Sequence, residues 1–291
     1  MAEQHSRASQ EHESTAERQE RDVAEEHSDQ QAQEAESLDA KTTYEVIRRE
    51  GKRELDRSTS ALFWSGLAAG LSMGFSSMAE ALLQSHLPEV PWRPLVATLG
   101  YSVGFLIVVL GSQQLFTENT LTPIIPLLSE RTMACARNVL RLWGTVLVAN
   151  LLGALLFALV IGRLDVVDPE VLRALSSLAM HAMRADFLPT VLHGVYAGWL
   201  IALMVWMLPG AETAKFAVII IMTYLVGLGG FAHVIAGSAE VFYLAVRGEA
   251  AWGAVIGRFI VPALVGNVLG GLTMVAALNH AQATSGEPEK R

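Results

Sequence analysis

Long apolar runs constrain the fold of this chain more than any other feature of its sequence. A helix needs about 20 apolar residues to cross the roughly 30 Å hydrocarbon core of a bilayer. Six runs reach that length, and they are Ala61–Leu83, Leu95–Leu128, Val139–Ile161, Phe187–Leu208, Phe216–Val246 and Ala254–Leu278. The sequence therefore predicts an all-α membrane protein in which residues 59–280 form a domain of six transmembrane helices.

The formal charge of −8 is concentrated before the first of these runs. Through Ser60 there are 16 acidic and 9 basic residues, and the remaining 231 positions hold 13 acidic and 12 basic residues. Residues 1–41 have too few apolar side chains to form a core, so we expect a disordered acidic tail there. Residues 42–58 alternate apolar and basic side chains, which is typical of an amphipathic helix at a membrane surface. Residues 281–291 form a second short tail.

The distribution of basic residues predicts the orientation in the membrane. Outside residues 1–41, eleven lysines and arginines fall on the side of the N-terminus and six on the other, when the runs are taken as successive crossings. Positive charge accumulates on the cytoplasmic side. We therefore expect a multi-pass protein of a bacterial inner membrane, with both termini in the cytoplasm. The single cysteine, Cys135, excludes an intramolecular disulfide and a cysteine-based metal site, and we expect no metal, cofactor or catalytic residue.

The first three runs resemble the last three in the order of their small and polar residues. The matches are Gly66–Gly70 with Gly194–Gly198, Leu115–Thr117 with Gly230–Ala232, and Ala149–Leu155 with Gly266–Leu272. Because three is an odd number, the two halves would enter the membrane from opposite sides as an inverted 3+3 repeat. We expect Asn150 and Asn267, which correspond in the third match, to form hydrogen bonds between helices.

The second and fifth runs are interrupted by residues that do not suit a lipid-facing helix. The second contains polar side chains and a proline over Gly111–Pro123, and the fifth contains glycines, His233 and Glu240. Irregular backbone is tolerated at membrane depth only where it is buried in protein or lines a wet cavity. The freed N–H groups carry partial positive charge, which favours an anion. We therefore predict a solute pathway at these two breaks, with His233 as its central ionisable group.

These motifs resemble the formate/nitrite transporter family over roughly residues 43–278. The likeness rests on Leu115–Thr117 followed by Leu121-Thr122, on Gly230–Ala236 and on Ala202–Met207. The resemblance implies an aquaporin-like inverted repeat with broken second and fifth helices, and a homopentamer with one pore in each subunit. It also implies roles for seven residues: Leu115, Phe116 and Thr117 in a flexible loop, Tyr101, Phe105 and Val226 in apolar constrictions, and His233 as the central histidine.

The sequence departs from the family's formate channels at several positions near the predicted pathway. Ala232 stands where those channels have a glutamate, and Gly237 and Gly198 stand where they have asparagines. Their lysine before the fourth helix has only His181 or Arg184 as approximate counterparts. These departures preserve the fold and the pore position and leave the identity of the solute open.

The predicted function is a channel or transporter for a small monovalent anion or its conjugate acid, with protons and the lipid bilayer as further partners and no nucleic acid. An anion stopped by apolar residues crosses as the neutral acid, and its proton comes either from His233 or from water. Thr117 shares a hydrogen bond with the solute. The alternatives are a neutral-solute channel, which the absence of any Asn-Pro dipeptide disfavours, and a non-conducting membrane regulator. An intramembrane hydrolase is disfavoured because the Gly-x-Ser-x-Gly sequence Gly70–Gly74 lies within the apolar run Ala61–Leu83, whereas the hydrolase motif requires a turn from a strand to a helix.

Overall fold

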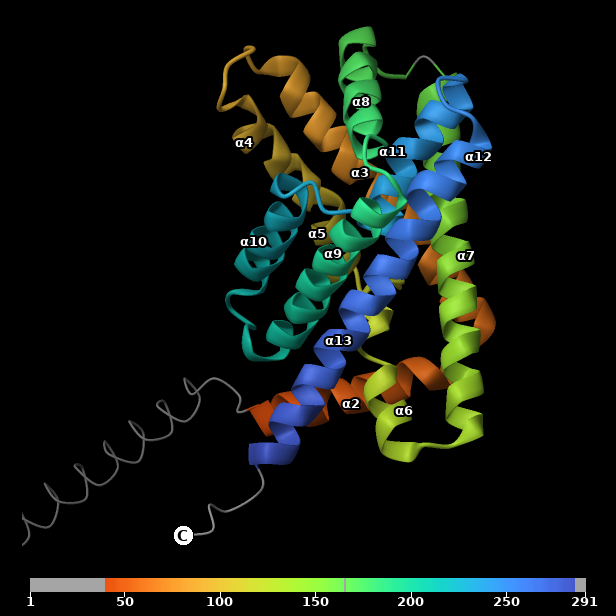
Figure 1. Ribbon diagram of the computed structural model, residues 1–291, viewed down its shortest axis with the longest axis vertical. Coiled ribbons are helices and arrows are strands. Elements are labelled where there is room, and N and C mark those ends of the chain that lie inside the picture. Colours follow the sequence, from red (N-terminus) through yellow and green to blue (C-terminus); the bar gives the residue numbers. More distant parts are fainter. Residues whose placement is uncertain (1–39, 165, 286–291) are drawn as a thin grey trace, which may run out of the picture. The chain divides into compact units, whose positions relative to one another are not determined.

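The computed structural model describes residues 40–164 and 166–285, and every regular element among them is a helix (Figure 1). Most of the predicted acidic tail, residues 1–39, lies outside the described residues, and so does the end of the second tail, residues 286–291. The surface helix predicted over residues 42–58 is α2, which spans Ala40–Asp56.

The helices differ widely in length. The long ones are α3 (Thr59–His86), α7 (Met133–Arg163), α9 (Phe187–Met207) and α13 (Val261–Ser285). Those of intermediate length are α5 (Ser102–Leu110), α8 (Pro169–Ala182), α10 (Lys215–Leu228) and α11 (Val234–Arg247). The short ones are α4 (Arg93–Ala97), η1 (Thr98–Tyr101), η2 (Glu118–Thr120), α6 (Ile124–Glu130), η3 (Leu208–Gly210), α12 (Trp252–Ala254) and the π-helical η4 (Val255–Ile260).

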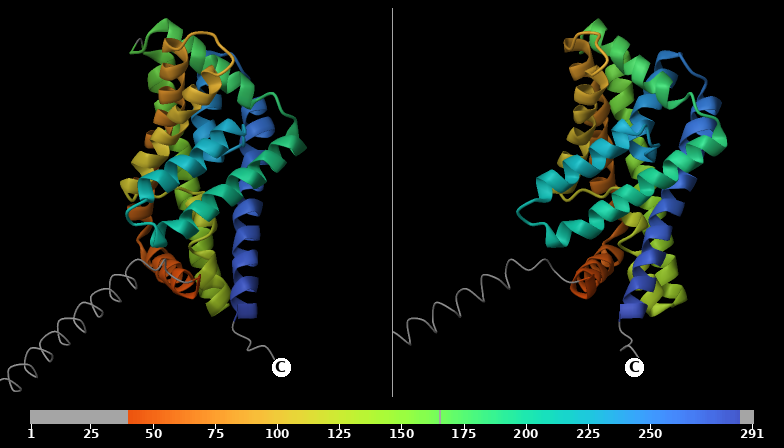
Figure 2. Two further views of the ribbon diagram at one scale, coloured as in Figure 1. Left: turned by 90° about the vertical axis from the view of Figure 1, so that its left-hand side faces the viewer. Right: turned by 60° about the vertical axis from the view of Figure 1, so that its left-hand side comes forward.

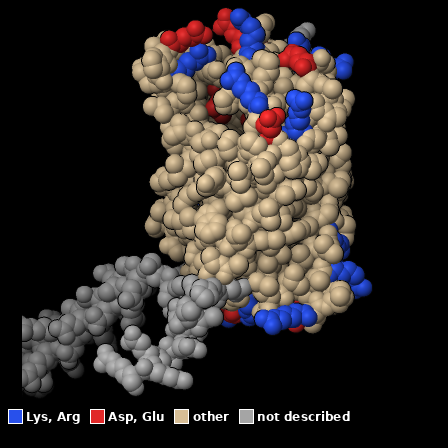
Figure 3. Space-filling view, viewed as in Figure 1, with Lys and Arg blue, Asp and Glu red and all other residues tan. Residues whose placement is uncertain are grey.

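Five helical stretches among the described residues are long and apolar enough to cross a membrane. They are Thr59–His86, Arg93–Leu110, Met133–Arg163, Phe187–Gly210 and Trp252–Leu278. The predicted run 216–246 is divided between α10 and α11, because the chain leaves the helical conformation at Gly229 and resumes it at Val234. Figure 3 shows charged side chains at the two ends of the visible face and an uncharged band between them.

Two pairs of long helices cross at close range, α3 with α7 and α9 with α13. A Cβ atom on Gly70 would lie 2.1 Å from the carbonyl oxygen of Asn150, and one on Gly198 would lie 2.3 Å from that of Asn267. No side chain fits at either crossing, so glycine is what lets the backbones touch. The close approach of Gly198 to Asn267 explains why this chain has glycine at position 198, where the resemblance implies an asparagine in the formate channels. Figure 2 shows that α9 and α10 are inclined to the more upright α7 and α13.

The surface helix α2 lies across one end of the bundle (Figure 1). Its residue Ile47 is completely buried. The guanidinium of Arg141 on α7 donates to the backbone oxygens of Leu55, at 2.7 Å, and Arg57, at 2.9 Å. Lys52 forms an ion pair with Glu130 at 2.7 Å, which holds the pKa of that carboxyl below its usual value. These contacts fix α2 against the ends of α6 and α7.

Candidate functional site

The first break follows α5, where Ser112 adopts the left-handed conformation with φ of 50° and the chain stays non-helical up to Thr117. Asn150 of α7 holds this segment in place. Its Oδ1 accepts from the N–H of Phe116 at 2.8 Å, and its Nδ2 donates to the carbonyl oxygens of Gln114 at 2.9 Å and Gly66 at 2.7 Å. The amide therefore satisfies backbone groups that the broken helix leaves without a helical partner.

The second break follows α10 and is held in the same way. Gly230 adopts φ of 60°, and α11 begins at Val234. Asn267 of α13 accepts from the N–H of Val234 at 2.8 Å and donates to the carbonyl oxygens of Ala232 at 2.7 Å and Gly194 at 2.9 Å. Both asparagines make the interhelical hydrogen bonds expected of them, and each also fixes the break in its own half of the chain.

The two breaks meet at His233 and Thr117. His233 is 1% exposed, and its Nδ1 accepts the N–H of Ala236 at 3.1 Å as the N-cap of α11. An accepting Nδ1 carries no proton, so in the neutral ring the proton is on Nε2. The Nε2–H group then donates a hydrogen bond to Thr117 Oγ1, which lies 2.7 Å away. The proton of the Thr117 hydroxyl has no acceptor among the described residues. It is therefore available for a solute.

Apolar and aromatic residues surround this pair. The ring of Phe105 lies 5.0 Å from the imidazole of His233, edge to face, and Tyr101 packs against Phe105 with 5.4 Å between ring centroids. Phe105 and Val226 are completely buried. Of the residues predicted for the pathway, Phe116 is placed differently from the others, because its ring packs against Trp143 of α7 at 5.8 Å.

A cavity of 340 Å³ opens from His233 toward α8, and we name it the α8-side cavity. Tyr101, Val226 and Glu240 also line it, so the structure brings together four of the predicted residues there. His181 and Arg184, the approximate counterparts of the family's lysine, are exposed and line the same cavity.

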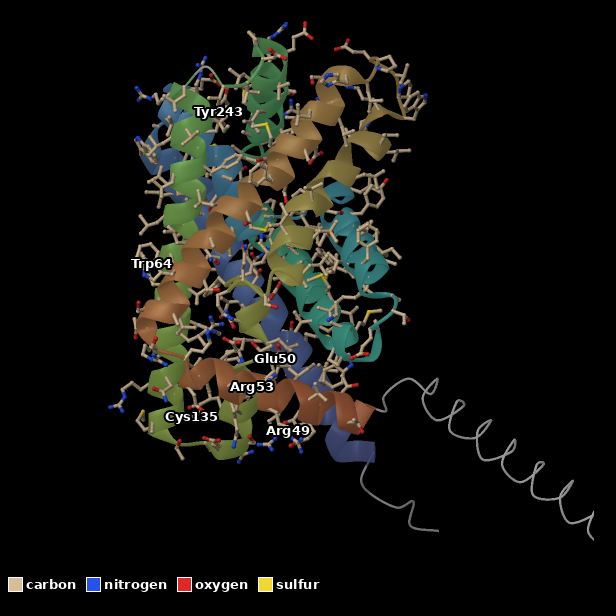
Figure 4. All side chains as sticks on the ribbon, turned by 180° about the vertical axis from the view of Figure 1, so that it is seen from behind. Arg49, Glu50, Arg53, Trp64, Cys135 and Tyr243 are labelled. Atoms are coloured by element: carbon tan, nitrogen blue, oxygen red, sulfur yellow. The ribbon has the colours of Figure 1, made fainter. Side chains whose placement is uncertain are left out.

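A second cavity of 280 Å³ lies next to α2, and we name it the α2-side cavity. Leu115, Glu118 and Glu50 line it, and Figure 4 shows that Glu50 and Arg49 leave α2 on opposite sides. It shares no lining residue with the α8-side cavity. Leu115 lines the α2-side cavity. Thr117, two residues later, is hydrogen-bonded to His233, which lines the α8-side cavity. The His233–Thr117 pair thus stands between two cavities that open toward opposite ends of the bundle.

Sequence reasoning missed two residues of the α8-side cavity. Glu80 of α3 accepts a hydrogen bond from Thr98 Oγ1 at 3.1 Å. It is the one charged residue in the run Ala61–Leu83, and that isolation in an apolar segment is the signal that could have found it. Phe259 of η4 fills the space beside Gly237, where a Cβ would lie 2.1 Å from the phenyl ring. An aromatic ring therefore occupies the place of the asparagine that the resemblance led us to look for.

Comparison with known proteins gives one family. A sequence model of the formate/nitrite transporter family matches residues 41–281. The chain is 40% identical over 252 residues to the inner membrane protein YfdC of Escherichia coli K12. The alignment covers 87% of this chain and 81% of YfdC.

Two solved structures share the fold. One is described as an FNT family ion channel, with a TM-score of 0.71 and 21% identity. The alignment covers 84% of the present chain and 99% of the chain in that structure. The other is a pentameric formate channel with formate bound, with a TM-score of 0.66 and 21% identity. This alignment covers 78% of the present chain and 98% of the chain in that structure.

Proposed function

Because this chain belongs to the formate/nitrite transporter family, we propose that it conducts a small monovalent anion, or the conjugate acid of that anion, across a membrane. The pathway runs within one subunit, from the α8-side cavity past His233 and Thr117 to the α2-side cavity. The observation that carries this proposal is the 2.7 Å contact between these two buried polar side chains, which lie between two cavities.

The architecture that we propose is six crossings in an inverted 3+3 repeat, with α10 and α11 together forming the fifth crossing. Two correspondences support it. Asn150 and Asn267, 117 positions apart, bind the two breaks through equivalent atoms. The left-handed residues Ser112 and Gly230, 118 positions apart, begin the two breaks. The α3–α7 and α9–α13 crossings correspond as well, each with a glycine against an asparagine.

We also propose that the protein is a homopentamer in a bacterial inner membrane, with both termini in the cytoplasm. The fold neighbour that holds formate is pentameric, and the relative YfdC is an inner membrane protein. The charge distribution favours the cytoplasmic side for α2. The residues that face the pathway lie inside one chain, so each subunit of such a pentamer has its own pore.

The mechanism follows from the surroundings of the polar pair. A bare anion is strongly disfavoured beside Phe105, Leu115 and Val226, which are all completely buried. The free proton of the Thr117 hydroxyl gives the solute one hydrogen bond, and His233 orients that hydroxyl by donating to its oxygen. The solute crosses as the neutral acid, whose proton comes from His233 or from water.

Tracer flux in liposomes tests this proposal. His233→Phe fills similar space without polar atoms and should reduce uptake of labelled formate to the level of empty vesicles. His233→Asn keeps a donor that cannot titrate, so retained flux would assign the proton to water and lost flux would assign it to the imidazole. His86→Phe, at the exposed end of α3 and outside both cavities, is the matched control and should conduct normally. Normal flux in His233→Phe, at equal reconstitution, would refute the pathway.

A further inference from the structure

Two carboxyl groups lie in the α8-side cavity together with His233. Glu240 projects from α11 and is 8% exposed, and Glu80 projects from α3 and is half-buried. They line the same cavity, although the two helices belong to different halves of the chain. An anion that reaches His233 from this side must therefore share one cavity with both carboxyl groups.

Neither carboxyl group has a cationic partner among the described residues. No ion pair includes Glu80 or Glu240, and Glu240 accepts no side-chain or backbone hydrogen bond there. The other titratable or charged groups that line the cavity are Tyr101 of η1, His181 of α8, Arg184 after α8, His193 of α9 and His233. A carboxyl group in such surroundings either carries a proton or faces a cation.

The protonation state decides how these groups act on an anion. An ionised carboxylate has only acceptor atoms and repels a second negative charge, whereas a protonated carboxyl group has an O–H that can donate to the anion. The gain from that donation is large in a cavity that Val226, Phe231 and Phe259 also line, because weak solvation strengthens hydrogen bonds.

We propose that Glu80 and Glu240 form a proton-controlled selectivity site for the anion. The pair admits a monovalent anion to His233 while one of the two carboxyl groups is protonated and donates to it, and it excludes the anion when both are ionised. The proton stays on the carboxyl group, so no covalent bond is exchanged at this step. The inference rests on the proposed function and adds to it a requirement for protons before the solute reaches His233.

Exchange of labelled formate, measured with the same pH on both sides of the liposome, tests the site independently of protein orientation. Glutamine keeps the size and a donor but cannot ionise, so Glu80→Gln with Glu240→Gln should remove the block at high pH. We expect the double variant and the wild type to agree within about twofold near pH 5, and the double variant to exceed the wild type by about tenfold near pH 9. Glu170→Gln, on the exposed surface of α8, should follow the wild type at every pH.

The possible outcomes separate this inference from the proposed function. Superimposable pH profiles for the wild type and the double variant, with flux still abolished by His233→Phe, would overturn the selectivity site and leave the pathway intact. Uptake of labelled methylammonium that is lost in the double variant would make the pair a cation site and would also overturn it. The absence of formate flux in the wild type at every pH would overturn both. Single Glu240→Gln, with gel filtration as a check on folding, repeats the test if the double variant does not assemble.

Discussion

Replacing Asn150 by leucine should destabilise the protein more than an ordinary polar-to-apolar change in a membrane helix. The side chain makes three hydrogen bonds, at 2.7, 2.8 and 2.9 Å, and it is completely buried. The carbonyl of Gly66 lies inside α3 and keeps its helical partner. The N–H of Phe116 and the carbonyl of Gln114 lie in the break and would be left without a partner.

The size of the effect follows from those two groups. A buried backbone group that loses its hydrogen bond costs about 1–3 kcal/mol, so the loss is about 2–6 kcal/mol in the free energy of unfolding. Leucine has the same number and branching of side-chain heavy atoms as asparagine, so none of this arises from a cavity. The free energy of unfolding can be measured by titrating SDS into micelles of a mild detergent, with tryptophan fluorescence as the readout.

Asn138→Leu provides the matched control. Asn138 lies on the same helix, is half-buried and makes no side-chain hydrogen bond among the described residues. We expect Asn267→Leu to resemble Asn150→Leu, because Asn267 binds the N–H of Val234 and the carbonyl of Ala232 at the second break. If Asn150→Leu and Asn138→Leu agree within about 1 kcal/mol, the asparagine does not hold the break and our reasoning about the two breaks fails.

Contacts at a helix crossing and at the surface helix lead to three more predictions. Gly70→Ala should abolish the assembled protein on gel filtration, because its Cβ would lie 2.1 Å from a carbonyl oxygen, whereas Gly144→Ala, with no atom within 4 Å, should have no effect. Arg141→Ala should expose α2 to trypsin at least several-fold faster, because it removes hydrogen bonds worth about 1.5–3 kcal/mol each; equal cleavage rates would contradict this. Hydrogen bonds from two arginines lower the pKa of Glu45 to about 2 from 4.5, so its stabilisation is present above pH 4.5 and is lost as the pH falls toward 2. The helicity of α2 should fall in that window, and by less in Glu45→Gln.

The sequence was sufficient to locate the breaks in the second and fifth apolar runs. The signals are residues that favour a turn or the end of a helix, namely Gly111, Pro123, Gly229 and Gly230, and their effect is local. The division of the run 216–246 into α10 and α11 follows from the same residues. The position of His233 at the end of a non-helical segment was predictable for a related reason, because it follows closely after the glycines that interrupt the fifth run. Its role in the pathway stays a prediction.

The partners across the fold could not be predicted in the same way. Nothing in the sequence states that Asn150 binds the backbone of residue 116, 34 positions earlier, because that contact depends on how α7 packs. The ring of Phe116 faces Trp143 for the same reason. Phe259 fills the space beside Gly237 only because η4 passes there, and Glu80 lines the α8-side cavity because α3 packs against α8 and α11. Each is a consequence of packing between distant segments.

Each break is fastened by an asparagine from its own half of the chain, and this has a consequence for biogenesis. Residues 59–163 contain α3, the first break and Asn150. The hydrogen bonds of Asn150 to Gly66 and Phe116 can therefore form before residue 187 is synthesised. The second half repeats this arrangement with α9, the second break and Asn267. The contact between His233 and Thr117 joins the halves and forms only after both have been inserted. We therefore expect the two halves to be inserted one after the other, and a cut between α7 and α8 should yield two fragments that recombine in the bilayer when they are expressed together.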